Sequence, residues 1–179
     1  MRSALNAIII FSLLLLLGGC ASATRSDGMS TELRSGVKYS TIDKTINVQV
    51  RGGSETTSMG ASQISNTDFR EAIKASIKSS ELFSSVAEDS VPADYVLQGT
   101  IIRVEQPAMG FSMTVDLEIA WLLKESGEAD ALIREAHDST YTASVGAAFA
   151  GVKRLRLATE GAAQNNILWV LDRISKLEL

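Results

Sequence analysis

The stretch that decides the fold is MTVDLEIAWLL, residues 113–123. Apolar side chains occupy every odd position of this stretch, and Thr114, Asp116 and Glu118 stand between them. Successive residues of a β-strand point to opposite faces of a sheet. The alternation therefore predicts a strand with one face on a hydrophobic core and the other face in water.

Two further strands are expected on either side of this stretch. Residues 94–105 are apolar on both faces, which indicates a central strand with some cover on each side. Residues 131–145 again carry apolar side chains of one parity, and short turns at 106–112 and 125–128 separate the three segments. Together, residues 94–145 predict an antiparallel meander.

The rest of the chain supplies a fourth strand and two helices. Residues 46–50 alternate between apolar and polar, and residues 68–80 and 152–177 repeat apolar side chains with a helical period. Asp68, with Glu71 three residues later, is the expected cap of the first helix. Two amphipathic helices can cover one face of a four-stranded sheet. The sequence therefore predicts an α+β two-layer sandwich, with a mainly antiparallel sheet, both helices on one face and the order β-α-β-β-β-α.

The N-terminus has the composition of an export signal. Arg2 provides a positive charge, and an apolar run from Ala4 to Leu17 follows it. This run of about 14 residues would span roughly 21 Å as a helix, which is short of the ~30 Å hydrocarbon core of a bilayer. The run ends in Leu16-Leu17-Gly18-Gly19-Cys20, which contains the single cysteine of the chain.

These five residues resemble the lipobox of bacterial lipoproteins. The resemblance implies cleavage between Gly19 and Cys20, a diacylglyceryl group on the Cys20 sulfur and an acyl chain on the amine that cleavage frees. Two or three chains of this kind make a stable membrane anchor. Ala21 follows the cysteine in place of the aspartate that retains lipoproteins in the inner membrane of enteric bacteria. The expected location is therefore the periplasmic face of the outer membrane.

The lipobox and the composition also predict how the chain is divided. Residues 1–19 are expected to be the signal peptide, and residues 20–41, rich in Ser, Thr, Ala and Gly, a lipidated cysteine followed by a flexible tether. Residues 42–179 are expected to form one periplasmic domain, a length sufficient for a real core.

Few residues suggest catalysis or metal binding. One histidine and one lipidated cysteine cannot supply the three or four ligands of a zinc site, so no metal is expected. The formal net charge of −4 argues against nucleic acid as a partner. His137 fits an ordinary strand position, and Asp116 and Glu118 are the one carboxylate pair with catalytic spacing. Because solvated acids on a strand face are far commoner, an enzyme is the remote alternative.

Two short segments are candidate contact surfaces. Lys153, Arg154 and Arg156 cluster at the start of the last helix, beside Phe149 in a loop of small residues. This combination suits a lipid headgroup or an acidic partner, although a solvated helix end with Phe149 buried is the favoured interpretation. Met109, Phe111 and Met113 around the 105–112 hairpin form the second candidate, although Met113 is expected in the core (Met and aromatic side chains favour adaptable contacts).

The order of these features resembles a group of small envelope lipoproteins with a β-α-β-β-β-α domain. The resemblance rests on the lipobox, on Leu82-Phe83-x-x-Val86 after the first helix, and on Ala93-Asp94-Tyr95-Val96-Leu97-x-Gly99 at the start of the meander. The group includes auxiliary lipoproteins of ABC-type lipid transport systems, the lipopolysaccharide-assembly lipoprotein LptE and the penicillin-binding-protein activator lipoproteins.

The resemblance implies a non-enzymatic role at the inner face of the outer membrane. The expected function is that of an accessory component of an outer-membrane assembly or transport system, with an envelope protein as its partner and no cofactor. The alternative is a lipoprotein that binds lipid or lipopolysaccharide directly, which requires an apolar cavity or groove between the sheet and the helices.

Overall fold

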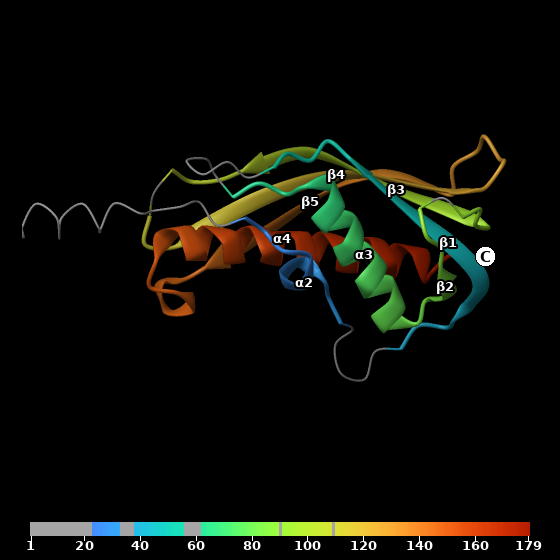
Figure 1. Ribbon diagram of the computed structural model, residues 1–179, viewed down its shortest axis with the longest axis horizontal. Coiled ribbons are helices and arrows are strands. Elements are labelled where there is room, and N and C mark those ends of the chain that lie inside the picture. The colour runs from blue at the N-terminus through green and yellow to red at the C-terminus, as the bar shows by residue number, and fades with distance from the viewer. Residues whose placement is uncertain (1–22, 33–37, 56–61, 90, 109) are drawn as a thin grey trace, which may run out of the picture.

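Five strands form one mixed sheet in the part of the chain that the computed structural model describes, and helices cover one face of this sheet (Figure 1). The described residues are 23–32, 38–55, 62–89, 91–108 and 110–179. In spatial order the strands are β2-β1-β3-β4-β5. The elements are β1 (Ile42–Arg51), β2 (Phe83–Val86), β3 (Tyr95–Glu105), β4 (Met113–Glu125), β5 (Ile133–Ala143), α2 (Ser26–Met29), α3 (Asn66–Ser80), the 3₁₀ turn η1 (Val145–Ala147) and α4 (Gly151–Ile174).

The α+β architecture predicted from the sequence is confirmed, but the sheet has five strands where four were predicted. The additional strand is β2, whose sequence Phe-Ser-Ser-Val is too short to display an alternating pattern. It becomes a strand because it pairs in parallel with β1. Since β1 also runs parallel to β3, the sheet is mixed, and its antiparallel part is the predicted meander of β3, β4 and β5.

The two neighbours of β1 are staggered along it. Val86, the last residue of β2, and Tyr95, the first residue of β3, both pair with Ile46. Strand β2 therefore ends at the level where β3 begins, and residues 87–94 suffice to cross β1. A parallel connection that has to return along the sheet usually needs a dozen or more residues.

Strand β4 lies at the centre of the core, as its alternation predicts. Its odd-numbered residues from Met113 to Leu123 are buried, and the residues between them are partly or fully exposed. The Trp121 ring centroid lies 6.1 Å from that of Phe69 on α3. The Trp121 indole N–H donates a hydrogen bond of 2.7 Å to Asn166 Oδ1 on α4. One side chain of β4 thus contacts both long helices.

Asn166 connects α4 to the backbone of the sheet. Its Nδ2 donates hydrogen bonds of 3.0 Å to His137 O and 3.0 Å to Ser139 Oγ, both on β5. Asn166 and Ser139 are both buried. A buried amide must be hydrogen-bonded to be tolerated in a core, and this one is satisfied only where α4 crosses β4 and β5 in the observed register.

Helix α3 is capped one turn earlier than the sequence predicts. Ser65 is the N-cap: its Oγ accepts the Asp68 N–H over 3.0 Å and donates to the Asp68 carboxylate over 2.7 Å. Asp68 therefore serves as the reciprocal partner of the cap, and the predicted pairing with Glu71 is wrong. Among the described residues, no helix is both long and apolar enough to cross a membrane.

The N-terminal segment, residues 23–32, packs against the domain, where the sequence predicts part of a flexible tether over residues 20–41. Met29 on α2 is fully buried. The Thr24 hydroxyl is also buried and donates a hydrogen bond of 2.7 Å to Gln63 O. The polar composition of the segment favours a tether, but its partners lie far away in the sequence and could not be recognised from local pattern.

Candidate functional site

One end of the molecule exposes apolar side chains from two loops and the start of a helix. We call this surface the apolar tip, formed by Phe111, Val145, Phe149 and Val152. Phe111 is 86% exposed and Phe149 is 101% exposed. The other two phenylalanines that the structure describes, Phe69 and Phe83, are buried in the core. Large apolar side chains that gather on one exposed surface indicate a contact site, whereas single ones do not.

Two segments that are distant in the sequence form the apolar tip. The 106–112 loop joins β3 to β4, and the 144–150 loop joins β5 to α4. The first loop ends, and the second begins, next to the terminal pair of the β4–β5 ladder, Met113 with Ala143. In Figure 1 they lie at the end of the molecule where α4 begins. The two candidate contact surfaces predicted from the sequence are therefore one surface, with Met113 in the core as expected and Met109 outside the described residues.

Arg154 holds the two loops together. Its guanidinium donates hydrogen bonds of 2.9 Å to Ala148 O and 2.7 Å to Phe149 O in one loop, and one of 3.2 Å to Gly110 O in the other. The residue is only 8% exposed. The expectation that Arg154 is a surface cation for a partner is thus wrong. It is a positioning residue that fixes the backbone carrying Phe149.

The other two cations of the predicted cluster differ from each other. Arg156 is partly buried, and its Nε lies 3.5 Å from Glu160 Oε1, one turn further along α4. Lys153 is exposed. Cations at a helix N-terminus are disfavoured by the helix dipole. Here Arg154 is bound by backbone carbonyls, and Arg156 lies beside the Glu160 carboxylate. Lys153 is the member of the cluster that is displayed at the apolar tip.

The candidate catalytic residues have structural partners. Asp116 accepts a hydrogen bond from the Thr140 hydroxyl, and Glu118 Oε2 lies 3.3 Å from Arg103 Nε. The His137 ring stacks on Trp169 with a centroid distance of 4.3 Å and an interplanar angle of 4°. Burial lowers the pKa of His137. These contacts are typical of residues that stabilise a sheet surface.

No group of three or more His, Cys, Asp or Glu side chains is placed to hold a metal ion within the described ranges. Gly19 and Cys20, the predicted cleavage and lipidation residues, lie outside the described residues.

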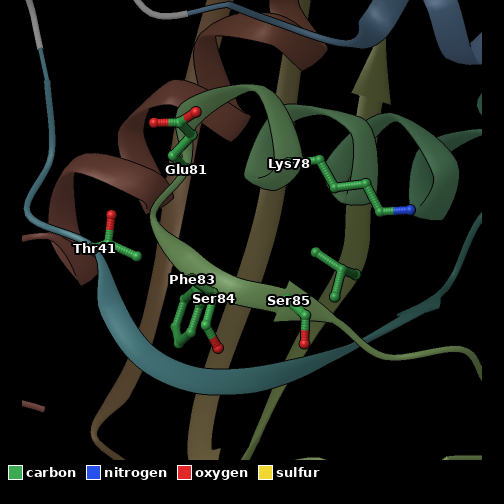
Figure 2. Close-up of a pocket in the computed structure, with 7 residues that line it drawn as sticks. Thr41, Lys78, Glu81, Phe83, Ser84 and Ser85 are labelled. Atoms are coloured by element: carbon green, nitrogen blue, oxygen red, sulfur yellow. The ribbon is translucent and has the colours of Figure 1, made fainter.

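A shallow pocket of about 350 Å³ lies beside the edge strand β2. It is lined by Thr41, Lys78, Glu81, Phe83, Ser84, Ser85 and Val86. Figure 2 shows that the two charged side chains, Lys78 and Glu81, come from the end of α3 and point away from each other. The Ser84 hydroxyl donates a hydrogen bond of 2.8 Å to Lys44 O. The side chains that line this pocket do not converge on a common point, as a catalytic site would require.

The layer between the sheet and the helices contains many fully buried apolar side chains, and a small pocket of about 170 Å³ opens at its margin, between α4, the end of β5 and α2. Its largest fully buried side chains are Trp121, Phe69, Met29, Ile46, Ile64, Ile73, Ile77, Leu82, Leu97, Leu117, Ile119 and Leu123. Direct lipid binding would require an apolar cavity in this layer. The packing of these residues gives that alternative no support.

The N-terminal segment lies along α4. The Gln164 side-chain amide donates hydrogen bonds of 2.9 Å to Gly28 O and 3.2 Å to Ser30 O. One turn earlier on α4, Glu160 Oε1 accepts the Arg25 N–H over 3.2 Å. The segment thus runs in the same direction as α4, and its earlier residues lie nearer to the helix N-terminus and the apolar tip.

Glu160 makes this docking sensitive to pH. Burial raises the pKa of the Glu160 carboxyl above its ordinary value, against the smaller opposing effects of Arg156 and the Arg25 N–H. The native state therefore keeps the proton at pH values where the unfolded chain has lost it, and the free energy of unfolding falls as pH rises through that window. We expect Glu160→Gln to remove this slope, so that the variant gains stability relative to the wild type as pH rises above the ordinary pKa of a glutamate, about 4.3.

Urea unfolding at a series of pH values measures this effect. Glu81→Gln is a matched control because Glu81 is exposed at the end of α3. A stability difference between wild type and Glu160→Gln that stays constant with pH would show that Glu160 titrates equally in both states.

The comparisons with known proteins identify the fold. No family model and no curated protein matches this sequence. Among solved structures, a protein of Xanthomonas campestris described as a member of the DUF330 family is similar with a TM-score of 0.60 and 12% identity, covering 84% of this chain and 91% of that one. A hypothetical protein of Chlamydia trachomatis has a TM-score of 0.53 and 9% identity, over 74% of this chain and 98% of that one.

A minor lipoprotein of Acinetobacter baumannii is more distantly similar, with a TM-score of 0.48 and 10% identity over 74% of this chain and 92% of that one. The two structures with TM-scores of 0.60 and 0.53 show a shared fold, and their identities of 12% and 9% show nothing finer. The chain therefore has the α+β fold of the DUF330 protein, and its function has to be argued from its own residues.

Proposed function

We propose that this protein is a lipid-anchored lipoprotein of the cell envelope that acts as a non-enzymatic accessory or binding component of an outer-membrane assembly or transport system. The observation that carries the proposal is the sequence Leu16-Leu17-Gly18-Gly19-Cys20 at the end of a short apolar run. Processing at this site would leave Cys20 as the first residue, with lipid on its sulfur and its amine. The folded domain would then be held at the periplasmic face of the outer membrane.

The arrangement of the domain supports a binding role. Helices α3 and α4 cover one face of the sheet, which leaves the even-numbered side chains of β4 on the opposite face at least partly exposed (Figure 1). The charged groups of that face are held by each other, as in the contacts of Arg103 with Glu118 and Asp138 at 3.3 and 2.9 Å. A surface of this kind is suited to contact with another protein, and its groups have no evident task in catalysis.

The anchor is tested by replacing its cysteine. Cys20→Ser should abolish lipid attachment and leave an unprocessed, mislocalised precursor, because a hydroxyl does not replace the thiol in this modification. Mass spectrometry of the N-terminal peptide and membrane fractionation measure the two effects. Ser22→Ala, two residues later, is the control and should keep both lipid and location. Normal fractionation of a processed Cys20→Ser protein would refute the anchor.

The accessory role is tested by crosslinking in intact envelopes. A photo-crosslinking residue at Gln98, opposite Leu122 on the open face of the sheet, should capture an envelope protein. The same residue at the exposed Lys78 of α3 serves as the control position. Capture of no envelope protein from Gln98, in cells where the chain is lipidated, would count against the accessory role while leaving the anchor intact.

A further inference from the structure

The apolar tip is a preformed surface. Arg154 ties the 106–112 loop and the 144–150 loop together through three backbone carbonyls, so Phe111 and Phe149 are presented from a fixed backbone. Exposed aromatic side chains at the end of a rigid element lose little conformational freedom when they are buried by a partner.

The charge of the two ends of the molecule differs in a way that points to lipid. The 106–112 loop and residues 144–153 contain no aspartate or glutamate, and Lys153 is the one charged residue in these two stretches. The turn at the opposite end of β4, residues 125–130, contains Glu125, Glu128 and Asp130. An anionic membrane surface attracts cations and apolar side chains and repels acidic groups. The apolar tip fits such a surface, and the opposite end does not.

The N-terminal segment brings the anchor to the same end. Ser30 and Gly28 lie at Gln164, and Arg25 lies one turn nearer to the start of α4, at Glu160. From Ser30 back to Arg25, the chain therefore approaches the apolar tip, and Cys20 lies further in the same direction along the sequence. Figure 1 shows the described part of this segment alongside the half of α4 that leads to the tip.

The length of chain that remains is short. Two residues, Ala21 and Ser22, lie between Cys20 and Ala23, the first described residue, so the Cα atoms of Cys20 and Ala23 can be at most about 11 Å apart. From Glu160 back to the first turn of α4, the helix rise amounts to roughly 14 Å. The lipidated end of the chain is therefore confined to the neighbourhood of the tip and cannot reach the distant end of the sheet.

We propose that the apolar tip inserts into the headgroup region of the same membrane that holds the lipid on Cys20, so that Phe111 and Phe149 form a second, non-covalent attachment. This inference rests on the proposed lipid anchor. Two attachments at one end fix the orientation of the domain. The strands then point away from the membrane, and the 125–130 turn lies furthest from it.

The test uses the lipidated full-length protein in vesicles of phosphatidylethanolamine and phosphatidylglycerol. Lipidation consumes the only thiol of the chain, so an introduced cysteine is the single site for an environment-sensitive fluorophore. Ala150→Cys places the probe beside Phe149 and keeps both phenylalanines, and Glu128→Cys places it at the opposite end as the matched control. Emission at position 150 should shift to the blue and be quenched by lipids that carry a nitroxide, whereas emission at position 128 should not change.

A second pair of variants tests the phenylalanines themselves. Phe111→Ser and Phe149→Ser, combined with the probe at position 150, should each move the equilibrium away from the inserted state by about tenfold. Leu132→Ser, which removes an exposed apolar side chain at the other end of β5, should leave the quenching at position 150 unchanged.

The outcomes separate the inference from the anchor on which it rests. Equal, weak quenching at positions 150 and 128 in a lipidated protein would overturn insertion and leave the proposed function standing. A blue shift at position 150 without quenching by the nitroxide lipids would also overturn it, because the tip would then be covered by protein. If the processed protein without an introduced cysteine reacts with the fluorophore, Cys20 is free, and both the anchor and the inference fail.

Discussion

Trp121→Ala should destabilise the protein by about 3–5 kcal/mol, the range for truncating a large buried aromatic side chain. Trp121 is 1% exposed and packs against Phe69 on α3 and over Gly99 on the neighbouring strand. Its removal leaves a cavity and also leaves Asn166 Oδ1 without its donor. Because both consequences fall where the sheet meets the two helices, the loss should be among the largest of any single substitution in this chain.

Equilibrium unfolding in urea, followed by circular dichroism, measures the loss. Trp121→Phe helps to separate the two contributions, since it removes the indole N–H but keeps an aromatic ring and therefore part of the packing, so its cost should be clearly smaller. Trp169→Ala is the matched control, because Trp169 is half-buried and stacks on the sheet at His137. A loss below about 1 kcal/mol for Trp121→Ala would contradict the position of this side chain at the centre of the core.

The core strand and the helices could be predicted because their patterns are local. The alternation of 113–123 identifies both the strand and its buried face, and the buried residues of α3 include Phe69, Ile73 and Ile77, the stripe expected from the helical period. When one face of a strand or helix is buried, apolar residues recur in its sequence with a period of 2 for a strand or 3.6 for a helix. Elements of this kind need no knowledge of what covers them.

Strand β2 and the docked N-terminal segment could not be predicted, because what defines them lies elsewhere in the chain. Phe83–Val86 is a strand through its pairing with β1. Residues 23–32 are ordered through contacts with groups far along the sequence, such as Gln63 and Glu160. Segments that are short or polar carry no periodic signal, so only the assembled structure reveals them.

Part of the candidate site could be predicted from the sequence. The composition of residues 144–156 singles out Phe149 with its cations, but the exposure of Phe149 contradicts the favoured interpretation in which its ring is buried. Phe149 and Phe111 lie on one surface because Arg154 connects their two loops. This connection includes a hydrogen bond of 3.2 Å from the Arg154 guanidinium to Gly110 O. No spacing within the sequence encodes that contact.

Gly28→Val should release the N-terminal segment from α4. A Cβ atom at Gly28 would lie 2.4 Å from the Glu160 carboxyl carbon and 2.6–2.7 Å from its oxygens. Glu160 is itself held by the Arg25 N–H and lies near Arg156, so the carboxylate has little freedom to move away. Undocking would expose Met29, which is fully buried, and we expect a loss of about 2–3 kcal/mol.

The release should be visible as new proteolytic cleavage within residues 23–32, with the remainder of the domain still folded. Ser26→Val, two residues earlier at a half-buried position of α2, is the control and should keep the segment protected. An unchanged cleavage pattern in Gly28→Val would show that α2 can shift to make room for the larger side chain. Met29→Asp, which would place a charge in the core, then provides an independent way to undock the segment.

Undocking also tests what the segment does for the anchored protein. While it is docked, a spacer of about 11 Å at most connects the lipidated cysteine to the domain, whereas a freed chain from Cys20 to Ile42 would reach on the order of 70 Å. A long flexible tether lowers the effective concentration of the tip at the membrane. In Gly28→Val, the probe at position 150 should therefore be quenched less by nitroxide lipids than in the wild type. Equal quenching would mean that the apolar tip finds the membrane without the short connection.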